Sequence, residues 1–507
     1  MKLTMRWRGV LGATALLCSL AATATPYELK TLAATRVDPT EVALPDVSGY
    51  TETAIQARLA PWLKRQGNAN LERMSTNVET RKFFMGGRLS MWAQMQGQFP
   101  QVLFVRGGLM TLPKLAAAFP AAIQLRGKAD YLLRLPLIVG ADGALLIAPG
   151  ETLRMSEERG SFLVNAGDCF VIKASLLGWR EQGNKPALFG GDKHKFRPFY
   201  TAWSGSETYM YGSEIAHLGS ATTKAYGISL SAFSKSDEIY APKGMNLKQR
   251  PTGWLVENHF FDMFYGFYSY EADDVVILRN RYEDNYYYGI DPHDRSRRLI
   301  IAENRVWGTK VRHGIIGSRE VDDSFIFRNI SFNNHLSGIM LDRLSNRNLV
   351  AHNVTYGNGS DGIAMYESHD NLLYANQVFE NAHHGIRFRN SRNIRIVDNL
   401  ILKNGRYGVY GHIKDLSYQT YRDFNLDPYE PRSSASLQGG VIGLNKSGAV
   451  FVDDTEQMAF SNLRLEENGG SVPLRGDLRP QAAEILLALR HQNSQVLLTQ
   501  SPVNPEP

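Results

Sequence analysis

The feature that most restricts the fold of this chain is a repeat of 23 to 25 residues that begins near residue 260. A glycine stands near the start of each repeat, at Gly266, Gly289, Gly314, Gly338, Gly362, Gly385 and Gly408. An asparagine closes each repeat, at Asn280, Asn304, Asn329, Asn353, Asn376 and Asn399. A second asparagine often follows five residues later, at Asn285, Asn334, Asn358, Asn381 and Asn404, with Thr309 as the exception. Repeats of this length are typical of leucine-rich repeats or of the coils of a parallel β-helix.

The residues inside the repeat distinguish these two architectures. Segments such as "LIIAEN", "SFIFRN", "NLVAHN" and "NIRIVDN" alternate like short strands, and turns rich in Gly, Asn and Asp separate them. The repeat contains neither a helical stretch nor a regular leucine skeleton. Asparagines that recur at one coil position can stack in a ladder whose amides satisfy buried backbone groups. The sequence therefore predicts an all-β fold, a right-handed parallel β-helix (solenoid) with short capping helices.

The ends of a solenoid need a cover, and amphipathic segments outside the repeat can supply it. We expect helices at 51–66 and 112–123, a C-terminal cap at 479–492, and a loop between coils at 415–434. The predicted organisation is one elongated domain in four parts. These are a secretory signal peptide (1–24), an N-terminal cap with the first coils (25–240), regular coils that carry the candidate site (241–415), and the last coils with a C-terminal cap (416–507).

The N-terminus has the pattern of an export signal. Lys2, Arg6 and Arg8 precede a short apolar core at 9–20, and small residues at 22–24 form a cleavage pattern. The apolar stretch is too short to span a bilayer, so we expect an exported protein without membrane insertion.

Composition limits the class of partner and the covalent supports of the fold. Cys169 is the only cysteine outside the predicted signal, so we expect no disulfide and no cysteine-based metal site. The formal net charge is +6. An exported basic protein is expected to bind an acidic polymer rather than nucleic acid.

One stretch, "YYYGIDPHDRSRR" at 286–298, brings an acid, a base and cations together. Alignment on the repeat glycines places His293 one coil from Arg319, about 4.8 Å along the axis. The same alignment predicts three files along the solenoid. They are Asp291, Ile316, Met340, Ala364 and Arg387; then His293, Ser318, Asp342, Tyr366 and Arg389; and beside these Asp294, Arg319, Arg343 and Glu367.

This arrangement suits removal of the proton on the carbon beside the carboxylate of a uronate. The resulting dianion is costly unless a cation is close, and an arginine can bind the carboxylate bidentately. A neutral histidine, with a pKa near roughly 6.5, suits the role of base. We predict that His293 is the base, that Arg319 neutralises the carboxylate, and that Asp291 or Asp294 fixes the imidazole tautomer. Because arginine takes the place of a divalent cation, we predict no metal and no other cofactor.

Neighbouring residues extend the cationic face along the solenoid. Arg343, Arg387 and Arg389 predict a row that suits a polyanion, and His313 can reach the same groove. Purely structural explanations remain open for several of these residues. Arg319 can form an ordinary ion pair with Asp294, the two aspartates can stabilise a turn, and the arginine row can serve to solubilise the surface.

The chain resembles the periplasmic mannuronan C5-epimerases of bacterial alginate biosynthesis. The resemblance rests on the secretory signal, the coil length, "DPHDRS" (291–296) and "NISFNNHLSGI" (329–339), and it covers nearly the whole mature chain. It implies conversion of D-mannuronate to L-guluronate within the polymer in the periplasm. His293 matches the family's catalytic base and Arg319 its carboxylate-neutralising arginine. It also implies polymannuronate (alginate) as the substrate and other proteins of a periplasmic alginate secretion complex as partners.

Two other functions fit the residues alone. A polyuronate lyase begins with the same proton abstraction and then expels the oxygen at C4. A non-catalytic component of an export complex would use the arginine face to bind the polymer. This second function does not explain the Asp-Pro-His-Asp sequence.

Overall fold

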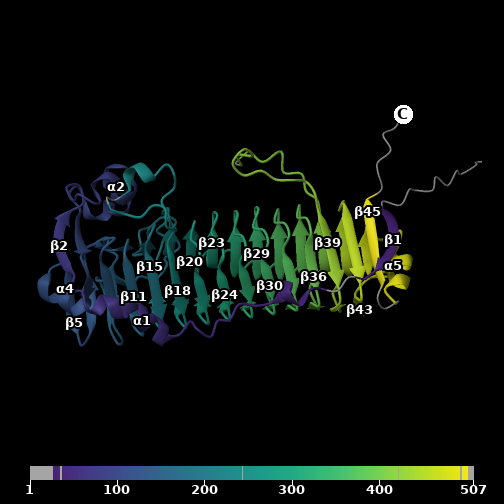
Figure 1. Cartoon of the computed structure of the whole chain (residues 1–507), viewed down its shortest axis with the longest axis horizontal. Coiled ribbons are helices and arrows are strands. Elements are labelled where there is room, and N and C mark those ends of the chain that lie inside the picture. Colours follow the sequence, from purple (N-terminus) through teal and green to yellow (C-terminus); the bar gives the residue numbers. More distant parts are fainter. Residues whose placement is uncertain (1–26, 35–36, 242–243, 421, 491–493, 501–507) are drawn as a thin grey trace, which may run out of the picture.

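The computed structural model describes residues 27–34, 37–241, 244–420, 422–490 and 494–500, and the predicted signal peptide (1–24) lies outside them. Three long sheets, here called sheets A, B and C, extend along the molecule and surround one core (Figure 1). Strands from successive coils pair in parallel within each sheet, as β23 and β26 do in sheet B. This arrangement confirms the prediction of an all-β parallel β-helix.

Sheet B carries the candidate site. In spatial order its strands are β2 (Asn68–Arg73), β3 (Gln101–Arg106), β7 (Leu137–Val139), β10 (Leu163–Asn165), β14 (Tyr200–Ala202), β17 (Gly227–Ser231), β20 (Tyr265–Tyr270), β23 (Tyr288–His293), β26 (Ile315–Ser318), β29 (Ile339–Asp342), β32 (Ile363–Tyr366), β35 (Ile386–Arg389), β38 (Tyr407–His412), β41 (Gly448–Asp453) and β44 (Leu474–Gly476).

Sheets A and C complete each coil. Sheet A consists of β1 (Tyr27–Ala33), β45 (Ser494–Gln500), β42 (Gln457–Ser461), β39 (Ser434–Gln438), β36 (Ile394–Val397), β33 (Leu372–Tyr374), β30 (Leu349–Ala351), β27 (Phe325–Phe327), β24 (Ile300–Ala302), β21 (Val276–Leu278), β18 (Thr252–Val256), β15 (Glu207–Tyr211), β11 (Asp168–Ile172), β8 (Ala144–Ile147) and β4 (Leu109–Thr111). Sheet C consists of β43 (Arg464–Glu466), β40 (Val441–Gly443), β37 (Leu400–Leu402), β34 (Gln377–Phe379), β31 (Val354–Tyr356), β28 (Ile330–Phe332), β25 (Arg305–Trp307), β22 (Arg281–Glu283), β19 (His259–Phe261), β16 (Glu214–Ala216), β12 (Ser175–Arg180) with β13 (Lys185–Pro186), β9 (Thr152–Ser156), β6 (Asp130–Leu133) and β5 (Ile123–Gly127).

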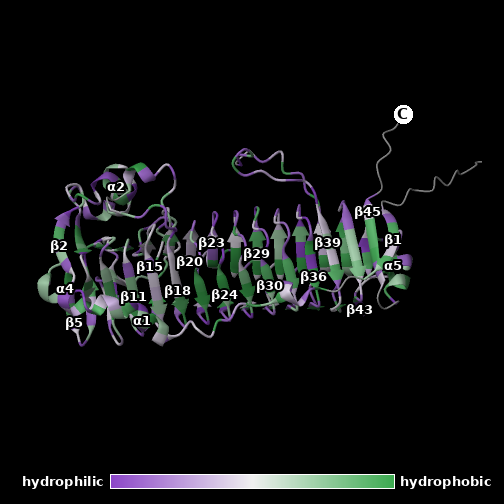
Figure 2. Ribbon diagram, viewed as in Figure 1, coloured by the Kyte–Doolittle hydropathy of each residue, from purple (hydrophilic) through white to green (hydrophobic). Residues whose placement is uncertain are grey.

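Alternation along the strands separates the core from the outer face. In the coil that starts with β23, the side chains of Ile290, Ile301 and Val306 are buried in the main hydrophobic core. Figure 2 shows apolar strands joined by hydrophilic turns. Because successive side chains of a strand point to opposite faces, Asp291 and His293 lie on the outer face of sheet B. The sequence alternation thus determines which residues can meet a ligand.

The predicted asparagine ladder is present at the bend between sheets A and C. The side-chain amide of Asn304 donates to Oδ1 of Asn329 at 2.9 Å, and the amide of Asn329 donates to Oδ1 of Asn353 at 3.0 Å. Each of these amides also donates to a buried backbone carbonyl, as Asn329 does to Ile301 at 2.8 Å. The ladder is confirmed, and it fixes neighbouring coils in register.

The two predicted helices and the predicted C-terminal cap each contain a helix shorter than the predicted segment, and residues 491–492 of the cap lie outside the described residues. These helices are α1 (Glu52–Leu63), α4 (Leu112–Ala118) and α5 (Ala482–Ala488). Helix α4 ends before Pro120, which disfavours the helical conformation of the residue that precedes it. Helix α4 packs beside β4 and β5 at the N-terminal end, and α5 lies at the opposite end (Figure 1). Helix α1 instead packs along the outside of sheet A, where Ile55 and Leu59 are buried.

Two features of the fold have no counterpart in the predictions. Strand β1 was assigned by sequence to the N-terminal cap, but it pairs antiparallel with β45 at the C-terminal end. The chain then follows the outside of sheet A towards the N-terminal end, where Val47 packs against that sheet (Figure 1). The helices α2 (Arg81–Met85) and α3 (Arg88–Trp92) form a small lobe beside the first coils. In the described part of the chain, the other helical elements are 3₁₀ turns at Pro39–Val42, Gln94–Gln96 and Glu238–Tyr240.

The predicted loop between coils is a long connection at 413–433, between β38 and β39. In Figure 1 it projects above sheet B and turns back towards the earlier coils. Within the described part of the chain, no helix has the length and apolar character needed to cross a bilayer.

Candidate active site

His293 is the last residue of β23, and the next residue begins a turn. Its Nδ1 lies 2.5 Å from Oδ2 of Asp294, and Oδ1 of Asp294 lies 3.2 Å from Nε of Arg319 on the next coil. Asp294 has φ 36, a left-handed conformation, and Arg319 has φ 65 at the same coil position. The shared turn conformation therefore brings the imidazole, the carboxylate and the guanidinium into one row, joined by a hydrogen bond and an ion pair.

The electrostatic surroundings of this row hold its members in different charge states. Burial lowers the pKa of His293, but the hydrogen bond to Asp294 and the nearby carboxylates outweigh burial and raise this pKa above its ordinary value. Burial acts to raise the pKa of Asp294, but the contacts with His293 and Arg319 outweigh burial and lower this pKa below its usual range. Asp294 is therefore ionised at neutral pH, and it accepts the proton on Nδ1.

Asp291 lies two residues before His293 on the same outer face. Only 1% of it is exposed, and its Oδ1 has no hydrogen-bond partner among the described residues. Burial raises the pKa of Asp291 to about 7. A carboxyl group in these surroundings exchanges a proton near neutral pH, which is a property expected near reacting atoms.

Pro292 interrupts the ladder between β23 and β26. Ile290 donates to the carbonyl of Gly314 at 2.9 Å and Asp294 donates to the carbonyl of Ser318 at 3.0 Å. The backbone donor that would lie between these two bonds is missing, because proline has no N–H. The pyrrolidine ring of Pro292 also fixes φ, so the backbone beside His293 stays restrained although this hydrogen bond to β26 is missing.

Tyrosines surround the row on its N-terminal side. The ring of Tyr268 lies 5.8 Å from that of His293, and Tyr268 is opposite Asp291 in the strand pairing. Burial raises the pKa of Tyr268 and of Tyr288 well above the ordinary value. Both phenols therefore keep their protons and can act as hydrogen-bond donors.

A groove of about 410 Å³ extends from Tyr287 and Tyr288 towards the C-terminal coils. Its floor includes Ile316 and Met340, which form an apolar cluster with Ala364 on the outer face of sheet B. Its wall includes His313, whose pKa is lowered to about 3 by burial. The backbone N–H of Ser337 donates to Nδ1 of His313 at 3.1 Å, so the proton of this neutral ring is on Nε2.

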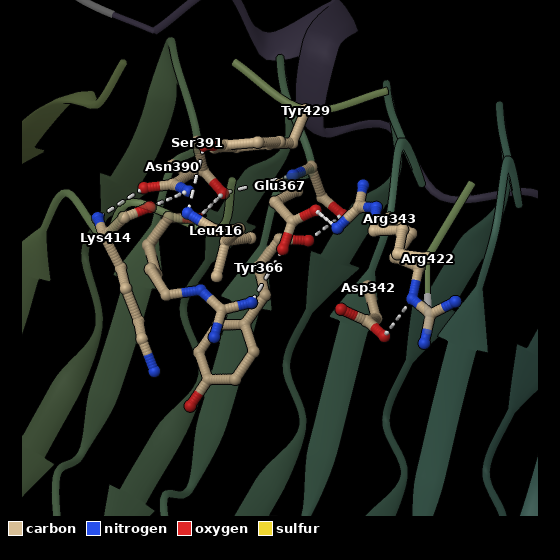
Figure 3. A network of polar contacts seen from close by, with 12 residues as sticks. Asp342, Arg343, Tyr366, Glu367, Asn390, Ser391, Lys414, Leu416, Arg422 and Tyr429 are labelled. Carbon is tan, nitrogen blue, oxygen red and sulfur yellow. Dashed lines mark hydrogen bonds and ion pairs between the residues drawn. The ribbon is translucent and has the colours of Figure 1, made fainter. Parts of the chain in front are cut away.

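The other wall of the groove is a network of ion pairs, drawn in Figure 3. Glu367 accepts from Arg389 at 2.7 Å and from Arg422 at 2.5 Å. Asp427 accepts from Arg422 and from Arg343, each at 3.2 Å. Arg343 and Arg389 are thus paired with carboxylates of the chain, and the connection 413–433 is fastened to sheet B.

The strand pairings place the predicted site residues as the repeat implied. His293 pairs with Ser318, Ser318 with Asp342, Asp342 with Tyr366, and Tyr366 with Arg389. His293, Asp291, Asp294 and Arg319 come together, whereas Arg387 lies apart, four strands beyond β23. Sequence reasoning missed Arg422 and Asp427. The only signal for them was the interruption of the repeat after Gly408, and it did not indicate where the connection lies.

Known proteins resemble this chain over most of its length. A mannuronan C5-epimerase of Pseudomonas putida is 42% identical over 477 residues, which cover 92% of this chain and 90% of the relative. One of Pseudomonas aeruginosa is 43% identical over 90% of this chain and 83% of its own length. The chain belongs to the mannuronan C5-epimerase family. The crystal structure of the periplasmic alginate epimerase AlgG is also similar, with a TM-score of 0.77 and 40% identity over 86% of this chain and 99% of that one.

The match to AlgG agrees with the periplasmic location expected from the N-terminal signal, and the protein is periplasmic. A family model described as periplasmic copper-binding protein (NosD) matches residues 201–343 and 319–421. Within the described residues, no three or more His, Cys, Asp or Glu side chains are grouped to hold a metal ion.

Proposed function

We propose that His293 removes the C5 proton of a D-mannuronate residue and that Arg319 binds the carboxylate of the same residue. The reaction class follows from the family: the protein is a mannuronan C5-epimerase, an isomerase that converts D-mannuronate to L-guluronate within the polymer. The observation that carries the residue assignment is the row His293–Asp294–Arg319, with contacts of 2.5 and 3.2 Å.

The geometry of this row suits a base. Asp294 accepts the proton on Nδ1, so Nε2 of His293 carries the free lone pair and can accept a proton from carbon. About a quarter of the His293 side chain is exposed, and the ring can meet a polymer on sheet B. Asp294 also stabilises the imidazolium that forms when the proton is taken.

Arg319 supplies the positive charge that the reaction needs. Proton removal spreads charge from C5 into the carboxylate, and a fixed guanidinium stabilises the dianion more than the substrate. In the free protein this guanidinium contacts Asp294 through Nε, and about a third of the side chain is exposed. The terminal nitrogens of Arg319 can therefore bind a uronate carboxylate while Nε stays beside Asp294.

The remaining site residues have supporting roles in this proposal. Asp291 exchanges a proton near neutral pH beside the reacting carbon, and a tyrosine or water returns hydrogen to the opposite face. The polymer follows the groove, with His313, Arg343 and Arg389 as contacts along it and Arg387 as a contact beyond its lining. We also propose that other proteins of a periplasmic alginate secretion complex bind this protein, an expectation that rests on the family.

The first prediction tests the base and the reaction class together. The protein is incubated with polymannuronate in deuterated water, and the product is examined by NMR and by chain-length analysis. We expect deuterium at C5 at constant chain length, and loss of this exchange in His293→Ala. A shorter, unsaturated product would indicate a lyase. Exchange at the normal rate in His293→Ala would exclude His293 as the base.

A further inference from the structure

The last regular coil before the connection 413–433 contains a second version of the active-site sequence. Residues 288–293 read Tyr-Gly-Ile-Asp-Pro-His, and residues 407–412 read Tyr-Gly-Val-Tyr-Gly-His. The strand pairings continue from Arg389 to His412, so His412 stands five register steps from His293 in the same file. At about 4.8 Å per step, the two imidazoles are about 24 Å apart along the axis.

The second histidine lacks the partners that make the first a base. Ile413 occupies the position of Asp294, so no carboxylate follows His412 directly. Nε2 of His412 instead lies 3.3 Å from Nη2 of Arg387 and accepts a hydrogen bond from it. Burial and this arginine lower the pKa of His412 to about 3. His412 is therefore neutral and serves to position Arg387 rather than to remove protons.

Arg387 lies on the outer face and, like Arg319, keeps side-chain donors available. Its guanidinium lies between the rings of Tyr366 and Tyr410, 5.3 Å from each centroid. A guanidinium has five N–H donors. Within the described residues Arg387 makes one hydrogen bond, to His412, and its nearest carboxylate, Asp361, is 3.9 Å away. A quarter of its side chain is exposed.

The charges around Arg387 favour an anion from the side of the groove. Lys414, two residues after His412, is exposed and has no ion pair in the described part of the chain. Asp361 is fully buried, and burial raises its pKa above the ordinary value, although the charge of Arg387 acts in the opposite direction. The next coil carries Asp453 opposite His412, followed by Asp454. The cationic face therefore ends at this coil.

We propose that Arg387, held by Tyr366, Tyr410 and His412, is a binding subsite for the carboxylate of a uronate residue remote from the one that reacts. Arg319 and Arg387 lie on coils three register steps apart, and one step is close to the length of one pyranose along an extended chain. A single polymer on the apolar floor of Ile316, Met340 and Ala364 can thus contact both arginines. The subsite binds and does not react. This inference rests on the proposed function, because it assumes that the reacting residue lies at His293.

The test measures affinity and rate for oligomannuronates of increasing defined length, in the full chain. In the wild-type protein, KM should fall when the oligomer becomes long enough to reach from His293 to Arg387. Arg387→Met should remove that gain and raise KM for a decamer about tenfold, with kcat unchanged. Arg387→Lys keeps the charge but loses the planar fork, so it should give an intermediate value. Arg464→Ala, in strand β43 of sheet C, is the control and should match the wild type.

Binding of the same decamer is also measured by calorimetry in the His293→Ala background. There Arg387→Met should again weaken binding about tenfold. Unchanged affinity in both assays, or a fall in kcat equal to the change in KM, overturns the subsite. His293→Ala that still epimerises overturns the proposed base instead, and the calorimetric result does not depend on that outcome. Thermal melting of each variant shows whether it is folded, and Arg387→Lys replaces Arg387→Met if the latter is not.

Discussion

Replacement of Asn329 by alanine should destabilise the solenoid by an amount that the ladder contacts determine. Oδ1 of Asn329 accepts from the backbone N–H and the side-chain amide of Asn304, and its own amide donates to the carbonyl of Ile301. Asn329→Ala removes the partner of all three groups, and Asn329 is fully buried. At about 1–2 kcal/mol for each buried group left unpaired, the expected loss is about 3–6 kcal/mol. The backbone N–H of Asn329 still donates to Asn353, so the coil beyond keeps one contact.

The assay is denaturant or thermal unfolding followed by circular dichroism, with Asn68→Ala as the matched control. Asn68 is exposed at the start of the edge strand β2, and an exposed substitution of this kind typically changes stability by about 0.5 kcal/mol or less. The ladder argument predicts a large difference between the two variants. If Asn329→Ala is no less stable than Asn68→Ala, the asparagine file contributes nothing and the reasoning is refuted.

Three further predictions concern the site. Asp294→Asn removes the carboxylate that raises the pKa of His293, so this pKa should fall. Since the base must be neutral, the acid limb of the pH profile of kcat/KM should then move to lower pH. The rate should fall about ten- to a hundredfold, because a charged hydrogen bond is lost. An unmoved limb would mean that the limb does not report His293. Activity should survive a strong chelator, because Arg319 neutralises the carboxylate; a complete loss that calcium restores would show that a metal has this role. Arg422→Ala should release the connection 413–433 from Glu367 and Asp427. Limited proteolysis should then cleave the variant within 415–434 faster than the wild type.

The regular coils could be predicted from the sequence because their contacts repeat at a fixed spacing. Every residue in a coil meets the residue 23 to 25 positions later, so one glycine alignment was enough to place Arg319 beside Asp294. The same regularity gave the file from His293 to Arg389 and the asparagine ladder. Local sequence determines these contacts, because each coil has the same shape as its neighbour.

Contacts outside the repeat could not be predicted in this way. The seven residues of β1 alternate only weakly, and nothing in them identifies β45 as a partner. The ion pair between Glu367 and Arg422 joins a coil to a connection 55 residues away, and the path of that connection is determined by its own packing. For the same reason, the repeat alone does not separate Arg343 and Arg389, which donate hydrogen bonds to carboxylates, from Arg387, whose contact with the carboxylate of Asp361 is 3.9 Å long.

The pairing of β1 with β45 has a consequence for the order in which the molecule is completed. Tyr27 lies opposite Gln500, so the earliest described strand of the chain has the latest one as its partner. Coils can form one after another as the chain is delivered, because each needs only the coil before it. Strand β1 must wait until the whole chain is present, since loop closure over such a separation is slow. Pairing of β1 therefore follows formation of the last coils. Loss of β1 would expose the edge of β45, whereas loss of β45 would expose the edge of β42 and leave β1 without its partner strand.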